Sequence, residues 1–195
     1  MDGLGQKFQH PEIERINRLP ETNFREVETQ EASIDPVSPQ ELRHAQRQWP
    51  TGVAIVAVSH QGVRHGMTVS SFTSLSLEPP WVLISLDRSS RTYHLVAEAG
   101  HFGVIFLSGQ QRAISERFAR RETEAEDRFA GLETHTLVSG APFLAGGLGS
   151  LDCRVVTTIE AGSNTLFIGE VLAARSGEGE LPLVYFNRQY RQLQE

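Results

Sequence analysis

The sequence predicts a mainly β protein whose antiparallel strands close into a barrel, with short helices at its periphery. Two observations support this fold class: at least seven apolar runs with strand character stand against three short helical segments, and the connections are mostly too short for parallel crossovers. Closure removes exposed strand edges, which favours a barrel over an open sheet. The chain has 195 residues, of which 39% are hydrophobic, enough for one domain with a real core.

The N-terminal segment differs from the rest of the chain. Residues 1–36 mix charges of both signs with few large apolar groups and little periodicity. Such a segment buries too little apolar surface to fold alone, so we interpret it as an arm that is flexible or wrapped on a partner subunit. The folded domain is expected over residues 37–195.

Three helices are predicted from their capping signals. The first spans residues 39 to about 48, with Ser38 as N-cap and Glu41 as its partner in a capping box, and it ends before Pro50. The second is the segment RTYHLVAEAG, which a glycine closes. The third is the segment SGQQRAISERFAR, which begins with a serine N-cap.

Strands are predicted where β-branched and aromatic residues cluster between turn signals. The first two form a hairpin, and two long strands near the C-terminus turn back on one another around Asn164. In chain order, the strands are expected over residues 53–58, 63–69, 80–87, 101–108, 151–162, 165–177 and 181–187.

Charge and cysteine content exclude several classes of protein. The net charge is −6 and the basic residues are spread out, so nucleic acid and anionic membrane surfaces are not expected partners. No 18 apolar residues run together, and the N-terminus lacks a signal-peptide pattern. Cys153 alone forms neither an internal disulfide nor a thiolate metal cluster, which is typical of a reducing compartment. We expect a soluble, cytoplasmic protein.

Common catalytic motifs are missing from the sequence. There is no Gly-x-Ser-x-Gly elbow, and the seven histidines show no His-Glu-x-x-His or other ligand spacing, so neither a hydrolase nor a metal site is predicted. Lys7 is the one lysine, which argues against a Schiff base or a phosphate-loop lysine. The run GGLGS at 146–150 lacks the full nucleotide-binding fingerprint and is interpreted as a flexible turn.

Two hydroxyl-rich segments flank the strand Trp81 to Asp87. The first, GMTVSSFTSLSLEPP, is either an ordinary strand, turn and strand or a group of hydroxyls and N–H groups that hold a polar ligand. In the second, DRSSRTYHLV, Ser89 and Ser90 precede a helix that begins near Arg91, where N–H groups and the helix dipole favour an anion. Alone, Ser90 is simply an N-cap. Together, the two segments predict one extended phosphate-bearing ligand.

Four segments carry a family likeness: WPTGVAIVAV, then GMTVSSFTSLSLEPPWVLISLDRSSRTYHLVAEAGHFGVIFLSGQQRAISERFA, then TLFIGEV and LVYFNRQYRQL. From about Trp49 to Leu193 the chain resembles the short-chain flavin reductases of the FMN-binding split-barrel fold. The resemblance implies an antiparallel Greek-key split β-barrel and a homodimer with FMN or FAD near the subunit interface. It also implies that NADH or NADPH passes hydride to flavin N5, and that reduced flavin serves a partner flavin-dependent monooxygenase.

The same resemblance implies which residues meet the flavin. No catalytic side chain is required, because the flavin itself supplies the chemistry. Backbone and hydroxyl groups would line the isoalloxazine at Thr68, Val69, Ser70 and Ser71, with Ser74 nearby, while the phosphate side would be Ser85, Ser89, Ser90, Arg91 and Thr92.

One position departs from the family pattern. Members often show Gly-Asp-His at the hairpin before the TLFIGEV strand, whereas here Ser163 and Asn164 occupy the last two positions. Asparagine can hydrogen-bond a nicotinamide carboxamide or a substrate, but it carries no positive charge. The leading hypothesis is an NAD(P)H:flavin oxidoreductase. The alternatives are a flavoenzyme that retains its flavin and oxidises or reduces a specialised organic substrate, and a flavin- or haem-binding module without turnover.

Overall fold

The computed structural model describes residues 35–120, 126–177 and 181–193. Two compact units are distinguished, Met1–Val37 and Ser38–Glu195, and all helices and strands below belong to the second. The predicted arm, residues 1–36, lies almost wholly outside the described residues, so it stays a prediction. None of the helices in these ranges is long and apolar enough to cross a membrane.

The chain forms few helices and many strands, as the sequence predicts. The helices are α2 (Pro39–Gln46), α3 (Arg91–Ala99), the 3-10 helix η1 (Gly109–Gln111) and α4 (Arg112–Ala119). The strands are β1 (Thr51–Gly52), β2 (Ala54–His60), β3 (Val63–Val69), β4 (Phe72–Leu77), β5 (Pro80–Asp87), β6 (His101–Phe106), β7 (Thr134–His135), β8 (Phe143–Leu144), β9 (Gly149–Ala161), β10 (Asn164–Ser176), β11 (Leu183–Phe186) and β12 (Gln189–Gln192). The third predicted helix is divided between η1 and α4.

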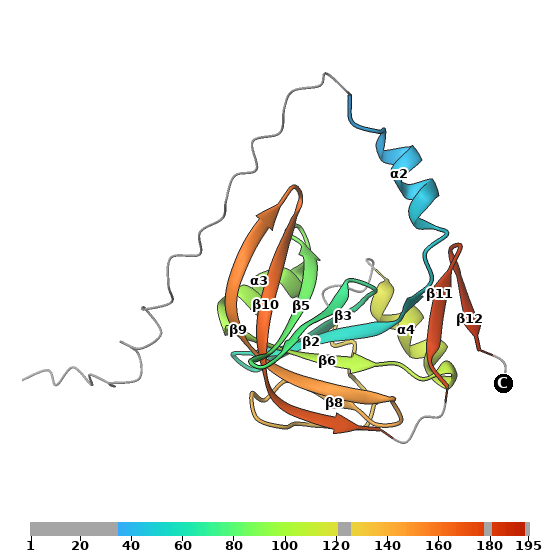
Figure 1. The fold of residues 1–195 in the computed structure, drawn as a ribbon. Helices are drawn as coiled ribbons and strands as arrows, with labels where there is room; N and C mark the ends of the chain where they lie inside the picture. The colour runs from blue at the N-terminus through green and yellow to red at the C-terminus, as the bar shows by residue number, and fades with distance from the viewer. Residues whose placement is uncertain (1–34, 121–125, 178–180, 194–195) are drawn as a thin grey trace, which may run out of the picture. The chain divides into compact units, whose positions relative to one another are not determined.

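Seven strands form one antiparallel sheet in the order β3-β2-β6-β9-β10-β5-β4, with β9 and β10 as its long hairpin (Figure 1). This confirms the predicted class, mainly β and antiparallel. The edge strands β3 and β4 are consecutive in the chain, and Ser70 and Ser71 alone separate them. We call these two residues the β3–β4 corner. No pairing joins β3 to β4 in the described ranges, so the barrel is split there, and the complete closure predicted from the strand edges is not observed.

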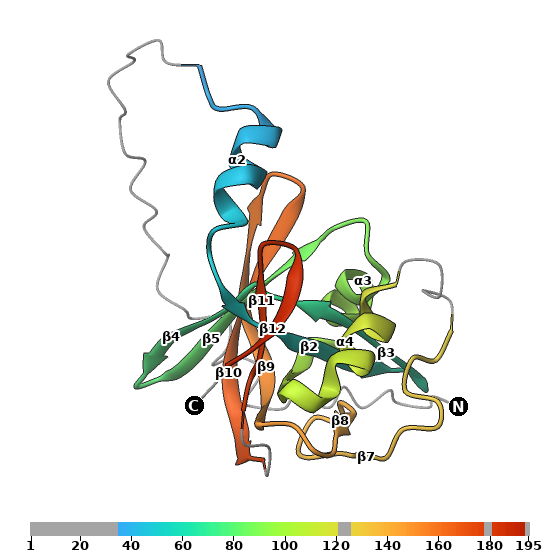
Figure 2. The same cartoon turned by 90° about the vertical axis from the view of Figure 1, so that its right-hand side faces the viewer.

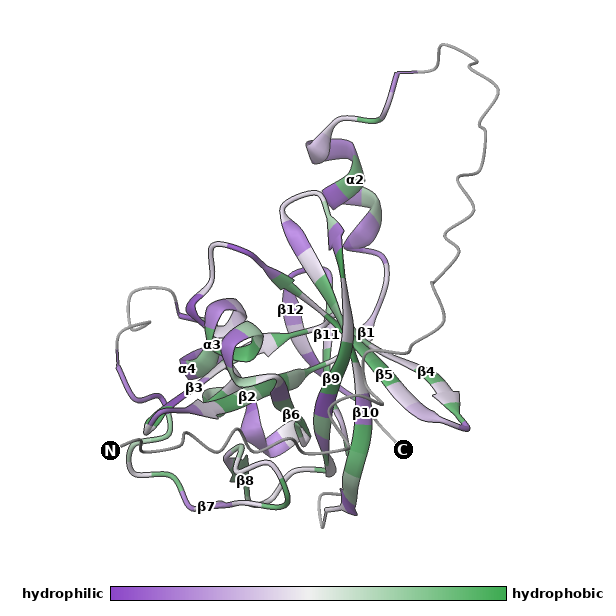
Figure 3. Ribbon diagram, turned by 90° about the vertical axis from the view of Figure 1, so that its left-hand side faces the viewer, coloured by the Kyte–Doolittle hydropathy of each residue, from purple (hydrophilic) through white to green (hydrophobic). Residues whose placement is uncertain are grey.

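Strand β2, next to the edge strand β3, is buried on both of its faces over residues 54–58. Ala54, Val56 and Val58 belong to one apolar cluster, and Ile55 and Ala57 belong to a second one. Strands covered on both faces have continuous apolar sequences, which explains the run of β-branched residues and the hydrophobic colour along β2 (Figure 3).

A second, three-stranded sheet has the order β1-β11-β12. Strand β12 comes from the C-terminal tail, where no strand is predicted, and β4 likewise falls in a segment with no predicted strand. β11 and β12 are joined by a two-residue turn, Asn187 and Arg188, both with positive φ. This sheet brings the C-terminal hairpin next to β1.

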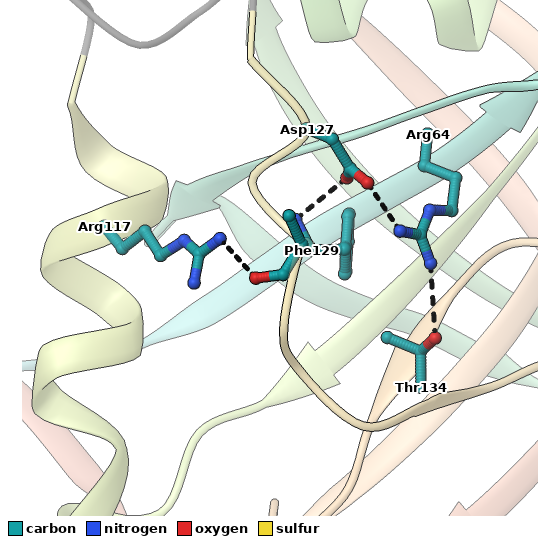
Figure 4. Close-up of polar contacts among 6 residues, drawn as sticks. Arg64, Arg117, Asp127, Phe129 and Thr134 are labelled. Atoms are coloured by element: carbon teal, nitrogen blue, oxygen red, sulfur yellow. Dashed lines mark hydrogen bonds and ion pairs between the residues drawn. The ribbon is translucent and has the colours of Figure 1, made fainter.

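Residues 126–134 are fixed against β3 and α4 by arginine contacts (Figure 4). Arg64 on β3 contacts the Asp127 carboxylate and donates to the Thr134 hydroxyl, and Arg117 on α4 donates to the Ala130 carbonyl. The buried Arg128 donates to the carbonyl of Gly66 at 2.8 Å. These contacts hold the segment 126–134 against β3 at Arg64 and Gly66, in the strand that leads to the β3–β4 corner.

Candidate functional site

The β3–β4 corner is tied to β5 through one side chain. The Ser71 hydroxyl donates to the Ser85 carbonyl at 2.8 Å and accepts from the Ser85 N–H at 3.3 Å. Ser71 therefore replaces a backbone partner at the point where β4 begins. Ser70, its neighbour, is exposed.

Thr68 and Val69, which were also predicted to line the isoalloxazine ring, lie differently from Ser70 and Ser71. The Thr68 hydroxyl donates to the Ser115 carbonyl of α4 at 2.7 Å, and Val69 is buried in the apolar core. Ser74 is exposed on β4, beside an irregularity in the β4–β5 ladder. At Thr68 and Val69, backbone groups are therefore better placed than side chains to meet a ligand.

The turn between β9 and β10 lies against the same part of β5. The side-chain amide of Asn164 donates from Nδ2 to the Ser85 hydroxyl at 3.0 Å, and the Ser163 hydroxyl donates to Oδ1 of Asn164 at 3.2 Å. The structure thus brings Ser71, Ser85 and Asn164 into one hydrogen-bonded row, which we call the serine–asparagine row. Its members come from three separate segments of the chain.

Helix α3 begins four residues beyond Asp87, the last residue of β5, with Ser90 as its N-cap. The Ser90 hydroxyl accepts from the Tyr93 N–H at 3.2 Å and donates to the Asp87 carbonyl at 2.8 Å. The Ser89 hydroxyl donates to the Asp87 carboxylate at 2.7 Å. Both hydroxyls are therefore used in shaping the turn.

Arg91 and Thr92 open the first turn of α3, where backbone N–H groups have no partners within a helix. Arg91 is half-buried, but Thr92 is completely buried, and its hydroxyl lies 2.9 Å from Nδ1 of the buried His65. The Thr92 hydroxyl therefore belongs to the core, and the prediction that it takes the phosphate side of the flavin is wrong for this side chain.

Two cavities lie beside the β3–β4 corner. One, of about 430 Å³, follows residues 70–73 and is closed on its other side by Phe106 and Leu183. The other, of about 620 Å³, lies between the end of α2, β1 and the β11–β12 turn. Trp49, Thr51 and Ser70 line both cavities.

Sequence reasoning missed most residues of the larger cavity, because its arginines come from a helix and a turn far apart in the chain. One signal was available: Asn187 directly follows the apolar run LPLVYF, and asparagine is favoured in two-residue hairpin turns. That signal indicates a turn, but the polar residues after Arg188 give no sign of the returning strand.

Other reactive groups contribute no nucleophile or metal site to these cavities. Burial and the nearby Asp152 carboxylate raise the pKa of Cys153 to about 12, so its thiol is protonated at neutral pH. Asp152 accepts from the N–H groups of Val138 and Ser139 and fixes a loop. Across the ranges given above, no three His, Cys, Asp or Glu side chains are grouped as metal ligands would be.

Comparison with known proteins gives one consistent family. The family model described as "flavin reductase like domain" matches residues 46–194. The chain is 35% identical to the reductase component of 4-nitrophenol 4-monooxygenase/4-nitrocatechol 2-monooxygenase from Rhodococcus opacus, over 80% of this chain and 82% of that protein. It is also 35% identical to the FMN reductase (NADH) RutF of Ancylobacter novellus, over 82% of this chain and 87% of that protein.

Solved structures agree with the sequence comparison. The NADH:FAD oxidoreductase SgcE6 of Streptomyces globisporus C-1027 superposes with a TM-score of 0.76 at 30% identity, covering 83% of this chain and 99% of that one. The similarity therefore extends over nearly the whole of the second compact unit.

Proposed function

Since the chain belongs to the flavin reductase-like family, we propose that it is an NAD(P)H:flavin oxidoreductase that supplies reduced FMN or FAD to a partner monooxygenase. The observation that supports this most is the serine–asparagine row, which joins the β3–β4 corner to the β9–β10 turn close to the start of α3. The start of α3, which suits an anion, and the fixed polar β3–β4 corner thus both adjoin strand β5.

The residues present fit a flavin through the chemistry of their donors. At the start of α3, the N–H group and the guanidinium of Arg91 suit a phosphate. At the corner, N–H groups of residues 68–71 suit the polar edge of the isoalloxazine. The hydroxyls of Ser71, Ser85 and Ser90 are bonded to the protein, so they hold this backbone in place before a ligand arrives.

Bound flavin would supply the redox chemistry, because its N5 takes a hydride from NADH or NADPH. The chain's own part is to orient and stabilise. Fixed N–H groups at the corner stabilise negative charge on the reduced ring, and they do so without reorganising. We assign to Asn164 a hydrogen bond to the nicotinamide carboxamide, a role that its placement next to Ser85 supports.

Homodimerisation is part of this proposal. The β4–β5 hairpin extends away from the rest of the sheet (Figure 2), and it exposes Leu75 by 45% and Leu77 by 87%. Exposed apolar side chains grouped in this way are typical of a protein interface. A second copy covering the hairpin would also shield the flavin. A cytoplasmic location is proposed from the single, buried cysteine.

Anaerobic rapid mixing tests the reductase activity directly. Protein with added FMN or FAD is mixed with NADH or NADPH, and the visible absorption band of oxidised flavin is followed. We expect the band to bleach with at least one donor. A band that persists with both donors and both flavins contradicts the proposal.

The role of Asn164 is tested with two substitutions. Asn164→Ala removes one neutral hydrogen bond, which corresponds to about 3- to 10-fold in KM for the donor. Asn164→His adds a group that can carry charge toward the nicotinamide nucleotide, and it should raise the reduction rate. FMN affinity, measured by fluorescence titration, is expected to stay within twofold for both. If neither substitution changes the donor kinetics, Asn164 does not contact the donor.

A second candidate function is a flavoenzyme that retains its flavin and acts on an organic substrate. Asn164 favours it, because a neutral amide suits a carbonyl or hydroxyl substrate as well as a carboxamide. This function predicts flavin that stays bound through gel filtration and does not exchange. Flavin that is lost from the protein on gel filtration contradicts it.

A further inference from the structure

Arginine side chains gather around the larger of the two cavities. Its volume is about 620 Å³, and three arginines and two aromatic residues line it together with Gln46, Thr51, Ser70 and Asn187. We call it the arginine cavity; its arginines are Arg43, Arg47 and Arg188, and its aromatic residues are Trp49 and Tyr185. The Asn187 N–H donates to the Arg47 carbonyl at 3.0 Å, so α2 and the β11–β12 turn are tied together at its wall.

The three guanidinium groups have no recorded hydrogen bond or ion pair within the part of the chain that the structure describes. Elsewhere the chain pairs its arginines: Arg64 contacts Asp127, and Arg154 contacts Glu170. Among the residues that the structure describes, no carboxylate lines the cavity. Within that part of the chain its charge is therefore positive, which favours an anionic ligand.

Arg188 occupies a backbone position that favours glycine. It is the second residue of a two-residue hairpin turn and has φ of 62°, while Asn187 has φ of 48°. Asparagine followed by glycine is the preferred sequence for such a turn, because a Cβ is disfavoured at positive φ. Keeping a long cationic side chain there costs conformational energy, and strained positions of this kind concentrate at ligand sites.

The arginine cavity is next to the proposed flavin site and shares Ser70 with it, but its arginines belong to neither proposed flavin contact. Trp49, Thr51 and Ser70 are shared with the cavity along the corner, whereas none of the residues at the start of α3 lines the arginine cavity. A flavin with its first phosphate at α3 therefore leaves these guanidiniums for another anion. Trp49 is 73% exposed, an unusual state for an indole, and it offers a flat face to a stacked base.

We propose that the arginine cavity binds the adenylate half of a dinucleotide, with its phosphate on Arg43 and Arg188 and its adenine on Trp49. This inference rests on the proposed function and extends it. The same chemical group occurs in FAD and in NAD(P)H, so either dinucleotide could place it there. Planar guanidiniums suit phosphate oxygens because they donate two parallel hydrogen bonds.

Direct binding of adenosine diphosphate and of ADP-ribose to the FMN-loaded full chain tests the proposal by calorimetry. The variants are Arg43→Gln, on an exposed helix face, and Arg188→Gly, which places the preferred residue in the turn and should keep or raise the melting temperature. Arg191→Gln is the matched control, since Arg191 lies on the same hairpin but outside the cavity. We expect each test variant to weaken binding about tenfold or more and the control to change it less than twofold.

Two further measurements identify the dinucleotide. If FAD supplies the group, Arg188→Gly weakens FAD but not FMN. If the hydride donor supplies it, the same variant raises KM for NADH with FMN bound and leaves the flavin affinities unchanged. Either result supports the proposal.

The outcomes that overturn it are equally clear. Wild-type protein that binds neither probe at millimolar concentration overturns it, as do affinities that are equal in wild type and both test variants. Neither probe contains a redox group, so this measurement is independent of turnover. Failure to reduce flavin with NADH and NADPH counts against the proposed function alone.

Discussion

The start of α3 and the arginine cavity both favour an anion, yet they are built in opposite ways. At α3 the hydroxyls are bonded to the protein: Ser89 to the Asp87 carboxylate, Ser90 to the Tyr93 N–H, and Thr92 to His65. In the arginine cavity, Arg43 and its two companions have no recorded partner within the described ranges. The first is a rigid frame that presents backbone N–H groups, whereas the second is a cluster of charges that a ligand would neutralise.

The largest expected effect comes from placing a negative charge at the start of α3. Aspartate caps a helix as well as serine, so Ser90→Asp should keep α3 and change the melting temperature little. Its carboxylate faces the proposed phosphate position, and we expect FMN affinity to fall about 10- to 100-fold, measured by fluorescence titration. Riboflavin, which lacks the phosphate, is the control ligand and should bind the variant within twofold of wild type. Equal losses for both ligands mean that the phosphate does not lie at α3.

Sequence reasoning predicted the fold well where the pattern is local. The run from Ala54 to Val58 is recognisable as a strand because both of its faces are buried and every position is apolar. The capping box of Ser38 and Glu41 is present as expected, with a 2.9 Å bond from the Ser38 N–H to Glu41. By contrast, β12 could not be found, because its polar residues form a strand only through pairing with β11.

At the candidate site, sequence could select residues but not the direction of their side chains. Ser71, Ser85 and Asn164 were selected from the sequence, and the structure joins them by hydrogen bonds, while their contacts with a ligand stay a prediction. Thr92 looks equally polar in sequence, but its hydroxyl points into the core toward His65. That difference depends on the rotation of α3 against β3, which no local pattern encodes.

A second substitution, at Thr92, tests whether a hydroxyl at the start of α3 stabilises the fold without contacting the ligand. Thr92→Val keeps the shape but removes the hydroxyl that contacts the buried His65, so we expect the free energy of unfolding to fall by about 1 to 3 kcal/mol. FMN affinity should stay within twofold, because the hydroxyl is inaccessible to a ligand. Thr92→Ser, which retains the bond, is the matched control in chemical denaturation. A loss of FMN affinity without a loss of stability reverses this assignment.

The hydroxyl at the β3–β4 corner has a smaller structural role. Ser71→Ala removes the bonds to the Ser85 backbone and should lower the free energy of unfolding by about 1 kcal/mol. Ser74→Ala, on an exposed site of the adjoining strand β4, should change it by no more than about 0.5 kcal/mol. Urea denaturation of the two variants gives the comparison. Equal stabilities contradict the view that Ser71 replaces a backbone partner.

The smallest effect is expected where an arginine of the frame is already paired. Arg88, directly before Ser89, contacts Glu160 at 3.0 Å, and both side chains are exposed, by 41% and 78%. Glu160→Gln should change the free energy of unfolding by less than about 0.5 kcal/mol, because exposed ion pairs contribute little. Arg88 also donates to the Gly162 carbonyl, so its position is kept when the acid is neutralised. The Arg88 guanidinium then lacks its carboxylate partner, like the guanidiniums of the arginine cavity. Because its positive charge is no longer offset by Glu160, FMN affinity at low salt should rise by about twofold at most. A loss of more than about 1 kcal/mol in urea denaturation contradicts the expectation and means that this pair stabilises the β9–β10 turn itself.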